Sequence, residues 1–211
     1  MTQAAHFWNR IAHRYAAKPI ADPDAYEATL ARTAHYLGTE DEVLELGCGT
    51  GGTALRLAPS VRHYTATDIA PLMIDIARDK LAERPIPNLT LAVAEPGADL
   101  LWGRRFDVVL AFNLFHLLPD PAAGLKQSCD LLRPGGYLVT KTPCLGGLGV
   151  RSAGYRIMVG GMKALGFAPH VSFLNQRTWP AQIRATGFDI VERGSHPMGS
   201  YNRFVVARRP E

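Results

Sequence analysis

The fold class of this chain is decided by the stretch Glu42-Val43-Leu44-Glu45-Leu46-Gly47-Cys48-Gly49-Thr50-Gly51-Gly52. Residues 42–46 form a short apolar strand that ends in a run of glycines, and residues 53–57 have the composition of a helix. Glycines let the main chain turn sharply from strand to helix and let a ligand approach the backbone. The stretch therefore predicts the first β/α unit of a sheet, with a binding site at the turn.

The alternation of strands and helices continues after this unit. Strands are expected over 61–67, 89–93, 106–111 and 136–141, and helices over 71–84 and 121–132. Pro134-Gly135-Gly136 is expected to separate the second of these helices from the strand after it, with Gly135 at positive φ. Two further strands, over 188–192 and 203–208, are too close in sequence for a helical crossover, so we expect them to pair antiparallel.

Two helices are predicted before the first strand, because apolar residues recur there at the spacing of one helix face. The first carries Phe7, Trp8 and Tyr15, and the second runs from Tyr26 to just before Gly38. We expect a single domain over 1–211, in which residues 1–38 form a helical cap. The whole pattern predicts an α/β fold with a doubly wound, Rossmann-like and mostly parallel sheet.

The composition excludes several classes of protein. The chain has 211 residues, of which 47% are hydrophobic and 20% charged, as expected for a globular domain. It has no apolar run long enough to span a membrane and no pattern of a secretory signal at its start, so we expect a cytoplasmic protein. Cys48, Cys129 and Cys144 do not pair as C-x-x-C, which indicates ordinary thiols. The histidines lack ligand spacing, so no metal is expected.

The net charge of +4 is unevenly distributed. Residues 1–140 carry 13 basic and 16 acidic side chains, residues 141–211 carry 10 and 3, and no acid occurs between Asp130 and Asp189. A basic segment attracts anions, although a solvated basic face is the simpler explanation. The Lys and Arg residues are dispersed and no recognition motif appears, so a nucleic-acid partner is not expected despite a pI of 9.1.

The choice of cofactor depends on a carboxylate beside the glycines. Gly47, Gly49 and Gly51 fit the pattern G-x-G-x-G, but the run also fits the dinucleotide pattern G-x-G-x-x-G. Glu45, at the carboxyl end of the strand, repels pyrophosphate and attracts an ammonium group. S-adenosylmethionine carries an α-amino group and a sulfonium but no phosphate, so it suits the site better than NAD. Asp68, which ends the next strand, is a candidate to accept hydrogen bonds from ribose hydroxyls.

Three further residues are candidates for the adenine side. Ile69 and Met73 follow Asp68 at the spacing of a loop and a first helical turn, and they are candidates for an apolar wall. A helix-core role is the alternative for Met73. Glu95, at the end of the third strand, is either an acceptor for the adenine amino group or an exposed loop acid.

Five motifs then occur in order and at consistent spacing. They are Val43-Leu44-Glu45-Leu46-Gly47-Cys48-Gly49-Thr50-Gly51, Asp68-Ile69-Ala70-Pro71, Phe106-Asp107-Val108-Val109, Asn113-Leu114-Phe115-His116-Leu117-Leu118-Pro119-Asp120 and Leu132-Arg133-Pro134-Gly135-Gly136. In these motifs the chain resembles the class I S-adenosylmethionine-dependent methyltransferases, most closely the small-molecule subgroup that includes the ubiquinone and menaquinone biosynthesis enzymes. The resemblance is strong over residues 40–142 and weak over the last two strands.

The resemblance implies a seven-stranded sheet of order 3-2-1-4-5-7-6 with the last strand antiparallel. By matching position, it places the methionine end of the cofactor against Glu45, Gly47 and the main chain of Ala111 and Phe112. It places the ribose on Asp68, the adenine near Ile69 and Glu95, and Tyr15 over the cofactor. One departure is that the usual Gly-Asp-Ala at the end of the third strand is Ala94-Glu95-Pro96 here.

Methyl transfer from a sulfonium requires alignment of the acceptor and exclusion of water, and it requires a base only if the acceptor holds its proton. His116 is the best candidate for that base, because it follows the central strand by a few residues. Capping the next helix or lining the cleft is its alternative role. His170, His196 and Tyr201 are expected at the rim of the acceptor cleft, or on loop surfaces.

Residues 145–180 form a longer connection than a plain β/α unit needs, so we expect an acceptor-recognition insertion. Its apolar stripe is made of Tyr155, Met158, Val159, Met162 and Leu165. A lid packed on the sheet, a contact with anionic lipid and a homodimer face are the roles considered, in that order.

The leading hypothesis is methyl transfer to a small, acidic or lipophilic acceptor. A phospholipid methyltransferase that docks on an anionic membrane is the alternative, and a nicotinamide-dependent oxidoreductase is a weaker one.

Overall fold

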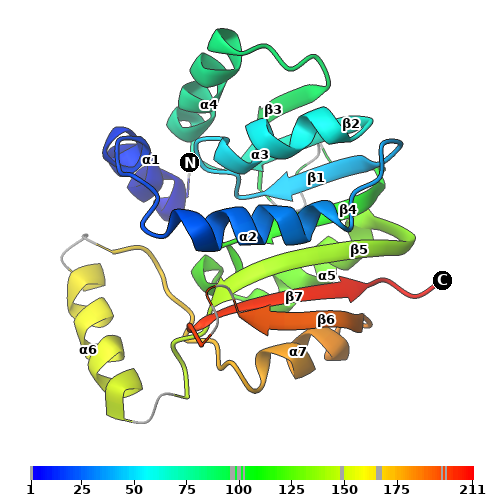
Figure 1. Cartoon of the computed structure of the whole chain (residues 1–211). Coiled ribbons are helices and arrows are strands. Elements are labelled where there is room, and N and C mark those ends of the chain that lie inside the picture. The colour runs from blue at the N-terminus through cyan, green and yellow to red at the C-terminus, as the bar shows by residue number, and fades with distance from the viewer. Residues whose placement is uncertain are drawn as a thin grey trace.

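The computed structural model describes residues 2–95, 98, 101, 103–147, 150–164, 168–195, 197 and 199–211. Its strands form one seven-stranded sheet in the order β3-β2-β1-β4-β5-β7-β6 (Figure 1). The strands are β1 (Glu42–Leu46), β2 (His63–Asp68), β3 (Leu89–Val93), β4 (Phe106–Phe112), β5 (Leu132–Pro143), β6 (Asp189–Ser195) and β7 (Asn202–Arg208). Neighbours from β3 to β5 are parallel, whereas β7 is antiparallel to both β5 and β6. This arrangement confirms the predicted fold class.

Helices cover both faces of the sheet. Successive strand residues point to opposite sides, so an apolar strand has side chains to bury on each face. Val43 belongs to the apolar cluster under α2 (Pro23–Ala34), α3 (Gly52–Leu57) and α4 (Pro71–Glu83). Its neighbour Leu44 belongs to the cluster under α5 (Pro121–Leu131) and α7 (Trp179–Ala185). Both side chains are fully buried. The central strands therefore have a core on each face, as their continuous apolar sequence predicts.

The first helix, α1 (Gln3–Ala16), packs against α4 at one end of the sheet (Figure 1). Ala12 and Met73 form a small buried cluster there, with Trp8 packed against it. The side-chain oxygen of Asn9 accepts a hydrogen bond of 2.9 Å from the backbone N–H of Leu72. These contacts hold α1 beside the segment that follows β2.

The boundary before β5 differs from the prediction. We expected Pro134-Gly135-Gly136 to precede a strand that begins at residue 136, but β5 already begins at Leu132. Leu132 pairs with Phe106, and the parallel register resumes only at Tyr137, so residues 133–136 form an irregularity inside the strand. Gly135 does have a positive φ of 78°, and its N–H donates to the carbonyl of Arg209, 2.9 Å away. Bonding to the chain after β7 therefore keeps this segment in the sheet.

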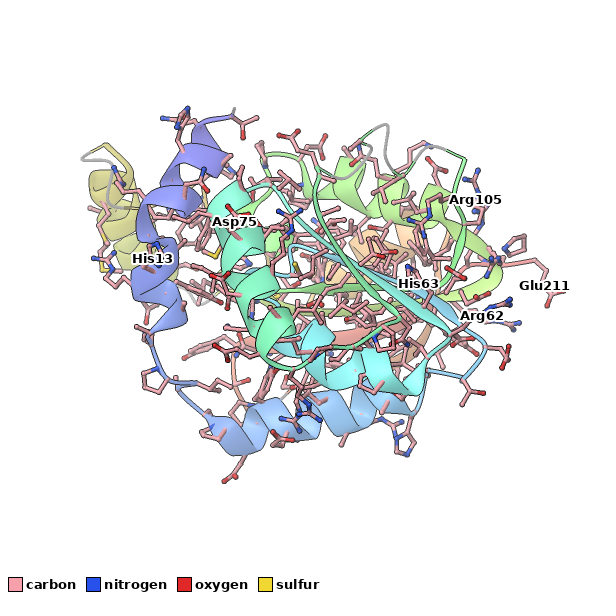
Figure 2. The ribbon with its side chains drawn as sticks, turned by 90° about the horizontal axis from the view of Figure 1, so that it is seen from above. His13, Arg62, His63, Asp75, Arg105 and Glu211 are labelled. Carbon is pink, nitrogen blue, oxygen red and sulfur yellow. The ribbon has the colours of Figure 1, made fainter. Side chains whose placement is uncertain are left out.

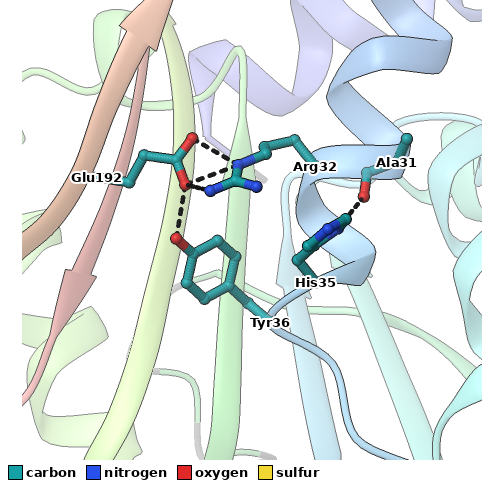
Figure 3. Close-up of polar contacts among 5 residues, drawn as sticks. All are labelled: Ala31, Arg32, His35, Tyr36 and Glu192. Carbon is teal, nitrogen blue, oxygen red and sulfur yellow. Dashed lines mark hydrogen bonds and ion pairs between the residues drawn. The ribbon is translucent and has the colours of Figure 1, made fainter.

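A polar cluster ties α2 to the edge strand β6 (Figure 3). Nε of Arg32 lies 2.7 and 2.8 Å from the two carboxylate oxygens of Glu192. The terminal nitrogen Nη2 of Arg32 lies 2.5 Å from Oε2 of Glu192. The hydroxyl of Tyr36 donates to the same Oε2 at 2.6 Å. A forked guanidinium and a phenol thus hold one carboxylate on an edge strand that makes only one sheet pairing.

The helix α6 (Val150–Ala164) stands at the side of the sheet (Figure 1). Ile157 is 78% exposed, and Tyr155, Met158 and Met162 of the predicted stripe are also exposed. The stripe is therefore not packed on the sheet here, and its last residue, Leu165, lies outside the described residues. Among the described residues, no helix has both the length and the apolar character that crossing a membrane requires.

Candidate functional site

The predicted site residues gather where the parallel strands end. β1, β2, β4 and β5 all end at the same edge of the sheet, and α1 lies beside that edge (Figure 1). Figure 2 shows His13 of α1 far from His63 and Arg105. His63 is the first residue of β2, and Arg105 directly precedes β4. The arginines near the starts of the strands therefore lie at the other end of the molecule from the site.

The turn after β1 needs glycine at three alternate positions. Gly47, Gly49 and Gly51 have φ angles of 69°, 54° and 76°, a region that side chains other than glycine rarely adopt. A Cβ atom at Gly51 would lie only 2.9 Å from Cβ of Ala77 on α4. Nζ of Lys80 then holds the turn from outside by donating to the carbonyl and the hydroxyl of Thr50, at 3.0 and 2.9 Å. The backbone is thus fixed in a shape that a ligand can approach closely.

Asp68 ends β2 directly beside this turn. Its Oδ2 accepts a 2.9 Å hydrogen bond from the N–H of Gly49, and its Oδ1 accepts one of 2.9 Å from the N–H of Ala70. Burial raises the pKa of Asp68, and the backbone N–H groups of Ala70, Gly49 and Ile69 counteract that rise. A carboxylate offers about four lone-pair positions, so Asp68 keeps acceptor capacity for a ribose hydroxyl.

Glu45 is the buried carboxylate of the site. Its side chain is 3% exposed and accepts a 2.9 Å hydrogen bond from the hydroxyl of Tyr64 on β2. Burial raises its pKa from the ordinary value of 4.5 to about 7; the Tyr64 bond lowers it, and the charge of Asp68 raises it further. Glu45 and Asp68 are thus close enough for their charges to interact, and among the described residues neither forms an ion pair. That arrangement favours a cationic ligand such as an ammonium group.

Tyr15 on α1 faces the glycine turn. A Cβ atom at Gly49 would lie 3.8 Å from Cε1 of Tyr15, and Trp8 holds the tyrosine ring in an edge-to-face contact with 6.1 Å between centroids. The side chain is 49% exposed, and both burial and the charge of Asp68 raise its pKa. The structure therefore places Tyr15 beside the glycine turn.

The adenine candidates differ in their surroundings. Ile69 is half-buried and lies next to Asp68. Met73 is only 2% exposed and packs with Ala12 and Ala70, which favours the helix-core alternative for this residue. Glu95 is exposed, and its main-chain oxygen accepts a hydrogen bond from Ala98. Pro96, the last residue of the departure from the usual motif, lies outside the described residues.

Polar groups also gather where β4 and β5 end. Ala111 is fully buried, and the half-buried Phe112 pairs with Lys141 of β5. The next residue, Asn113, has a φ of 53° and is the one described non-glycine residue with positive φ. Its N–H donates a 2.7 Å hydrogen bond to the carbonyl of Lys141. Neither Asn113 nor Lys141 is among the site residues predicted from the sequence, although Lys141 is visible there as a charge at the end of an apolar strand.

His116 lies in a short 3-10 turn, η3 (Phe115–Leu117). Burial lowers its pKa from 6.5 to about 4, and its Nδ1 atom is buried with no hydrogen-bond partner among the described residues. Its carbonyl accepts a 2.7 Å bond from the N–H of Ser172, whose hydroxyl in turn lies 3.0 Å from Nε2 of His170. His116 and His170 thus lie on one side of the site, Tyr201 is exposed before β7, and His196 lies outside the described residues.

Comparison with known proteins identifies the family that has this fold and glycine turn. A family model described as a methyltransferase domain matches residues 12–193. The chain belongs to this methyltransferase family. Membership confirms the predicted enzyme class and the predicted cofactor, S-adenosylmethionine, over the nicotinamide alternative.

Curated relatives share part of this sequence. Aklanonic acid methyltransferase DauC of Streptomyces sp. (strain C5) is 32% identical over 108 residues, which cover 50% of this chain and 49% of that protein. The ubiquinone biosynthesis O-methyltransferase of Xylella fastidiosa is 31% identical over 118 residues, 47% of this chain and 41% of that protein. The reducing polyketide synthase Preu2 of Preussia isomera is 33% identical over 103 residues, 46% of this chain and 4% of that protein. The matches span half or less of these relatives.

Solved structures share the fold. The CcbJ methyltransferase of Streptomyces caelestis superimposes with a TM-score of 0.75 at 21% identity, and all of each chain is covered. The N-methyltransferase NodS of Bradyrhizobium japonicum WM9, solved in complex with S-adenosyl-L-homocysteine, gives a TM-score of 0.66 at 19% identity, covering 97% of this chain and 99% of NodS.

Proposed function

We propose that this chain transfers a methyl group from S-adenosylmethionine to a small-molecule acceptor held over the carboxyl ends of β4 and β5. The observation that carries the proposal is the placement of two carboxylates, Glu45 and Asp68, around a turn with three glycines at positive φ. Relatives named as acting on aklanonic acid and in ubiquinone biosynthesis support a small-molecule acceptor.

Each cofactor-binding residue is assigned to one part of the cofactor. Glu45 faces the ammonium end, Asp68 receives the ribose hydroxyls, and Tyr15 covers the turn from α1. The glycines at 47, 49 and 51 and the main chain of Ala111 and Phe112 complete the site, with Ile69 and Glu95 on the adenine side. S-adenosylmethionine supplies an activated methyl group on a sulfonium sulfur. The protein mainly orients the acceptor toward it and excludes water.

His116 is the proposed proton acceptor for acceptors that enter the site protonated. Its imidazole is neutral at pH 7, because burial holds its pKa near 4. A neutral imidazole has a free lone pair, but such a low pKa makes it a weak base. The site therefore depends more on alignment than on proton transfer, and His116 serves best for an acceptor that is already acidic.

The segment 145–180 is proposed as the part of the single domain that recognises the acceptor. Ser172 of this segment binds the carbonyls of His116 and Leu118, through its N–H at 2.7 Å and its hydroxyl at 2.8 Å. The segment is thus attached to the loop that follows β4. The exposed side chains of α6 are then available to cover a bound acceptor as a lid.

Parallel calorimetric titrations with S-adenosylhomocysteine and with NADH test this proposal. We expect saturable binding of S-adenosylhomocysteine and none of NADH, since the carboxylate of Glu45 repels a pyrophosphate. Tight binding of NADH without binding of S-adenosylhomocysteine would overturn the proposed function.

A further inference from the structure

We propose that Lys141 binds an anionic group of the methyl acceptor, which makes the acceptor a small organic acid. This inference rests on the proposed function and adds the substrate class to it. It is carried by the position of Lys141 and by the surroundings of its ammonium group.

Lys141 lies at the acceptor end of the site. It is two residues before the end of β5, it pairs with Phe112, and its carbonyl holds the N–H of Asn113. A charged side chain at the carboxyl end of a central strand of an open α/β sheet lies where ligands bind in such sheets.

Within the described part of the chain, the ammonium group of Lys141 has one hydrogen-bond partner. Nζ donates a 2.9 Å hydrogen bond to Oγ1 of Thr29 on α2, and that hydroxyl donates its own proton to the carbonyl of Ala25, 2.6 Å away. An ammonium has three donors, so this contact uses one of them. Burial lowers the pKa of Lys141, while the charge of Asp22 acts in the opposite direction. Among the described residues no carboxylate forms an ion pair with it.

A partly desolvated cation without an ion-pair partner is costly unless a ligand supplies the opposite charge. The chain offers no acid from residue 131 to residue 188, which includes the segment proposed to recognise the acceptor. A carboxylate or an ionised hydroxyl of the acceptor fits this requirement, whereas an amine acceptor in its cationic form is repelled.

A groove on α1, the helix that brings Tyr15 to the glycine turn, combines apolar and basic groups. It is lined by Phe7, Arg10, Ile11 and Arg14, which share the face of α1 that carries both apolar and basic groups. The guanidinium of Arg10 lies over the ring of Phe7, 5.4 Å from its centroid. An organic acid with an apolar body matches this combination, because the apolar side chains contact its body and the arginines attract its charge.

The test is binding of matched acidic and neutral probes to the protein loaded with S-adenosylhomocysteine. The pairs are 3,4-dihydroxybenzoate with its methyl ester, and decanoate with decanamide. We expect at least one acid to bind about tenfold more tightly than its neutral partner. Lys141→Met should remove that preference without weakening the neutral probe, and Lys141→Arg should retain most of it.

Two further variants separate recognition from a structural role. Thr29→Val removes the hydroxyl partner but keeps the ammonium, so it should retain the preference for acids. If Lys141 only fastens β5 to α2, Thr29→Val and Lys141→Met should instead behave alike. Lys126→Met is the matched control, because Lys126 is an exposed residue of α5 that pairs with Asp130.

Equal affinity for acids and neutral probes, binding of none of the probes, or an unchanged preference in Lys141→Met would each overturn the inference. The affinity for S-adenosylhomocysteine is measured in every variant. A wild-type protein that binds S-adenosylhomocysteine but shows no preference for acids contradicts this inference alone, whereas a wild-type protein that binds no S-adenosylhomocysteine contradicts the proposed function.

Discussion

The hydroxyl of Tyr64 on β2 donates a 2.9 Å hydrogen bond to Oε2 of Glu45 on β1, and both side chains are buried. The pairing arises from the register of two parallel strands. Tyr64 lies beside Val43, and Glu45 lies two residues further along β1, on the same face of the sheet. The bond favours the charged form of a carboxylate that burial would otherwise neutralise.

The affinity for S-adenosylhomocysteine should therefore depend on pH. Glu45, with a pKa of about 7 in the free protein, is largely protonated at pH 6 and ionised at pH 8. A cationic ligand needs the ionised form, so affinity should increase as the pH rises through 7 and then level off, by about tenfold between pH 6 and pH 8. Calorimetric titrations across this range check the prediction.

Two variants assign this pH dependence. Glu45→Gln should bind weakly at every pH and lose the dependence. Tyr64→Phe removes the bond that lowers the pKa of Glu45, so the midpoint should move to higher pH. An unchanged midpoint in Tyr64→Phe would show that another group, such as Asp68, is the one that titrates.

Asp68→Ala should raise the dissociation constant for S-adenosylhomocysteine by about tenfold to several hundredfold. Charge-assisted hydrogen bonds contribute about 1.5 to 3 kcal/mol, and the variant also frees the N–H groups of Gly49 and Ala70. Asp75→Ala is the control, because Asp75 pairs with Arg78 on the exposed side of α4. Normal cofactor affinity in a folded Asp68→Ala protein would contradict the assignment.

The imidazole of His116 should stay neutral from pH 5.5 to pH 8. Its pKa is lowered to about 4 by burial, so its ring resonances in a ¹H–¹³C NMR spectrum should not shift over this range. The spectrum of His116→Asn assigns the resonance. A titration midpoint near the ordinary value of 6.5 would mean that the ring is open to water, and it would contradict the role of His116 as a weak buried base.

Gly51→Ala should destabilise the protein more than Gly103→Ala does. Both glycines have positive φ, at 76° and 73°, but a Cβ atom meets Ala77 at 2.9 Å in the first case and nothing within 4 Å in the second. Backbone strain and overpacking together should cost about 2 kcal/mol or more at Gly51, and strain alone about 1 kcal/mol at Gly103. Urea unfolding measures both; equal losses would show that the contact with α4 relaxes without cost.

The cluster of Arg32 and Glu192 should show measurable coupling in a double-mutant cycle of unfolding. The guanidinium binds the carboxylate through two nitrogens, and Tyr36 binds the same oxygen. The pair Arg56 and Glu27 is a matched control, since it joins α3 to α2 with both side chains about half exposed. We expect little coupling there. Similar coupling free energies for the two pairs would mean that the cluster does not stabilise the edge strand.

Most of the fold could be predicted because each strand and helix is specified locally. The glycine run marks the turn after β1, and Asp120 caps α5 through Ala122 and Ala123, where the pattern placed a helix start. The beginning of β5 was missed because the glycines at 135 and 136 bond to Arg209, a partner distant in sequence. Local turn signals do not reveal such a partner.

The placement of candidate residues at strand ends could be predicted, whereas contacts that depend on tertiary packing could not. The location of Glu45 and Asp68 beside the glycine turn could be predicted from their positions at the ends of strands. The bond from Tyr64 depends on strand register, and the burial of His116 depends on how the chain near Ser172 packs. The positive φ of Asn113 also has no sequence signal beyond the tolerance of asparagine for that region.

The glycine turn touches the loop after β4: a Cβ atom at Gly47 would lie 3.0 Å from Cδ1 of Leu114. Leu114 follows Asn113 directly, so the leucine belongs to the acceptor side and the glycine to the cofactor side. An acceptor that displaces Leu114 must therefore alter the space at Gly47. Thermodynamic reciprocity requires that the coupling produced by such a displacement change the affinity for each substrate by the same factor.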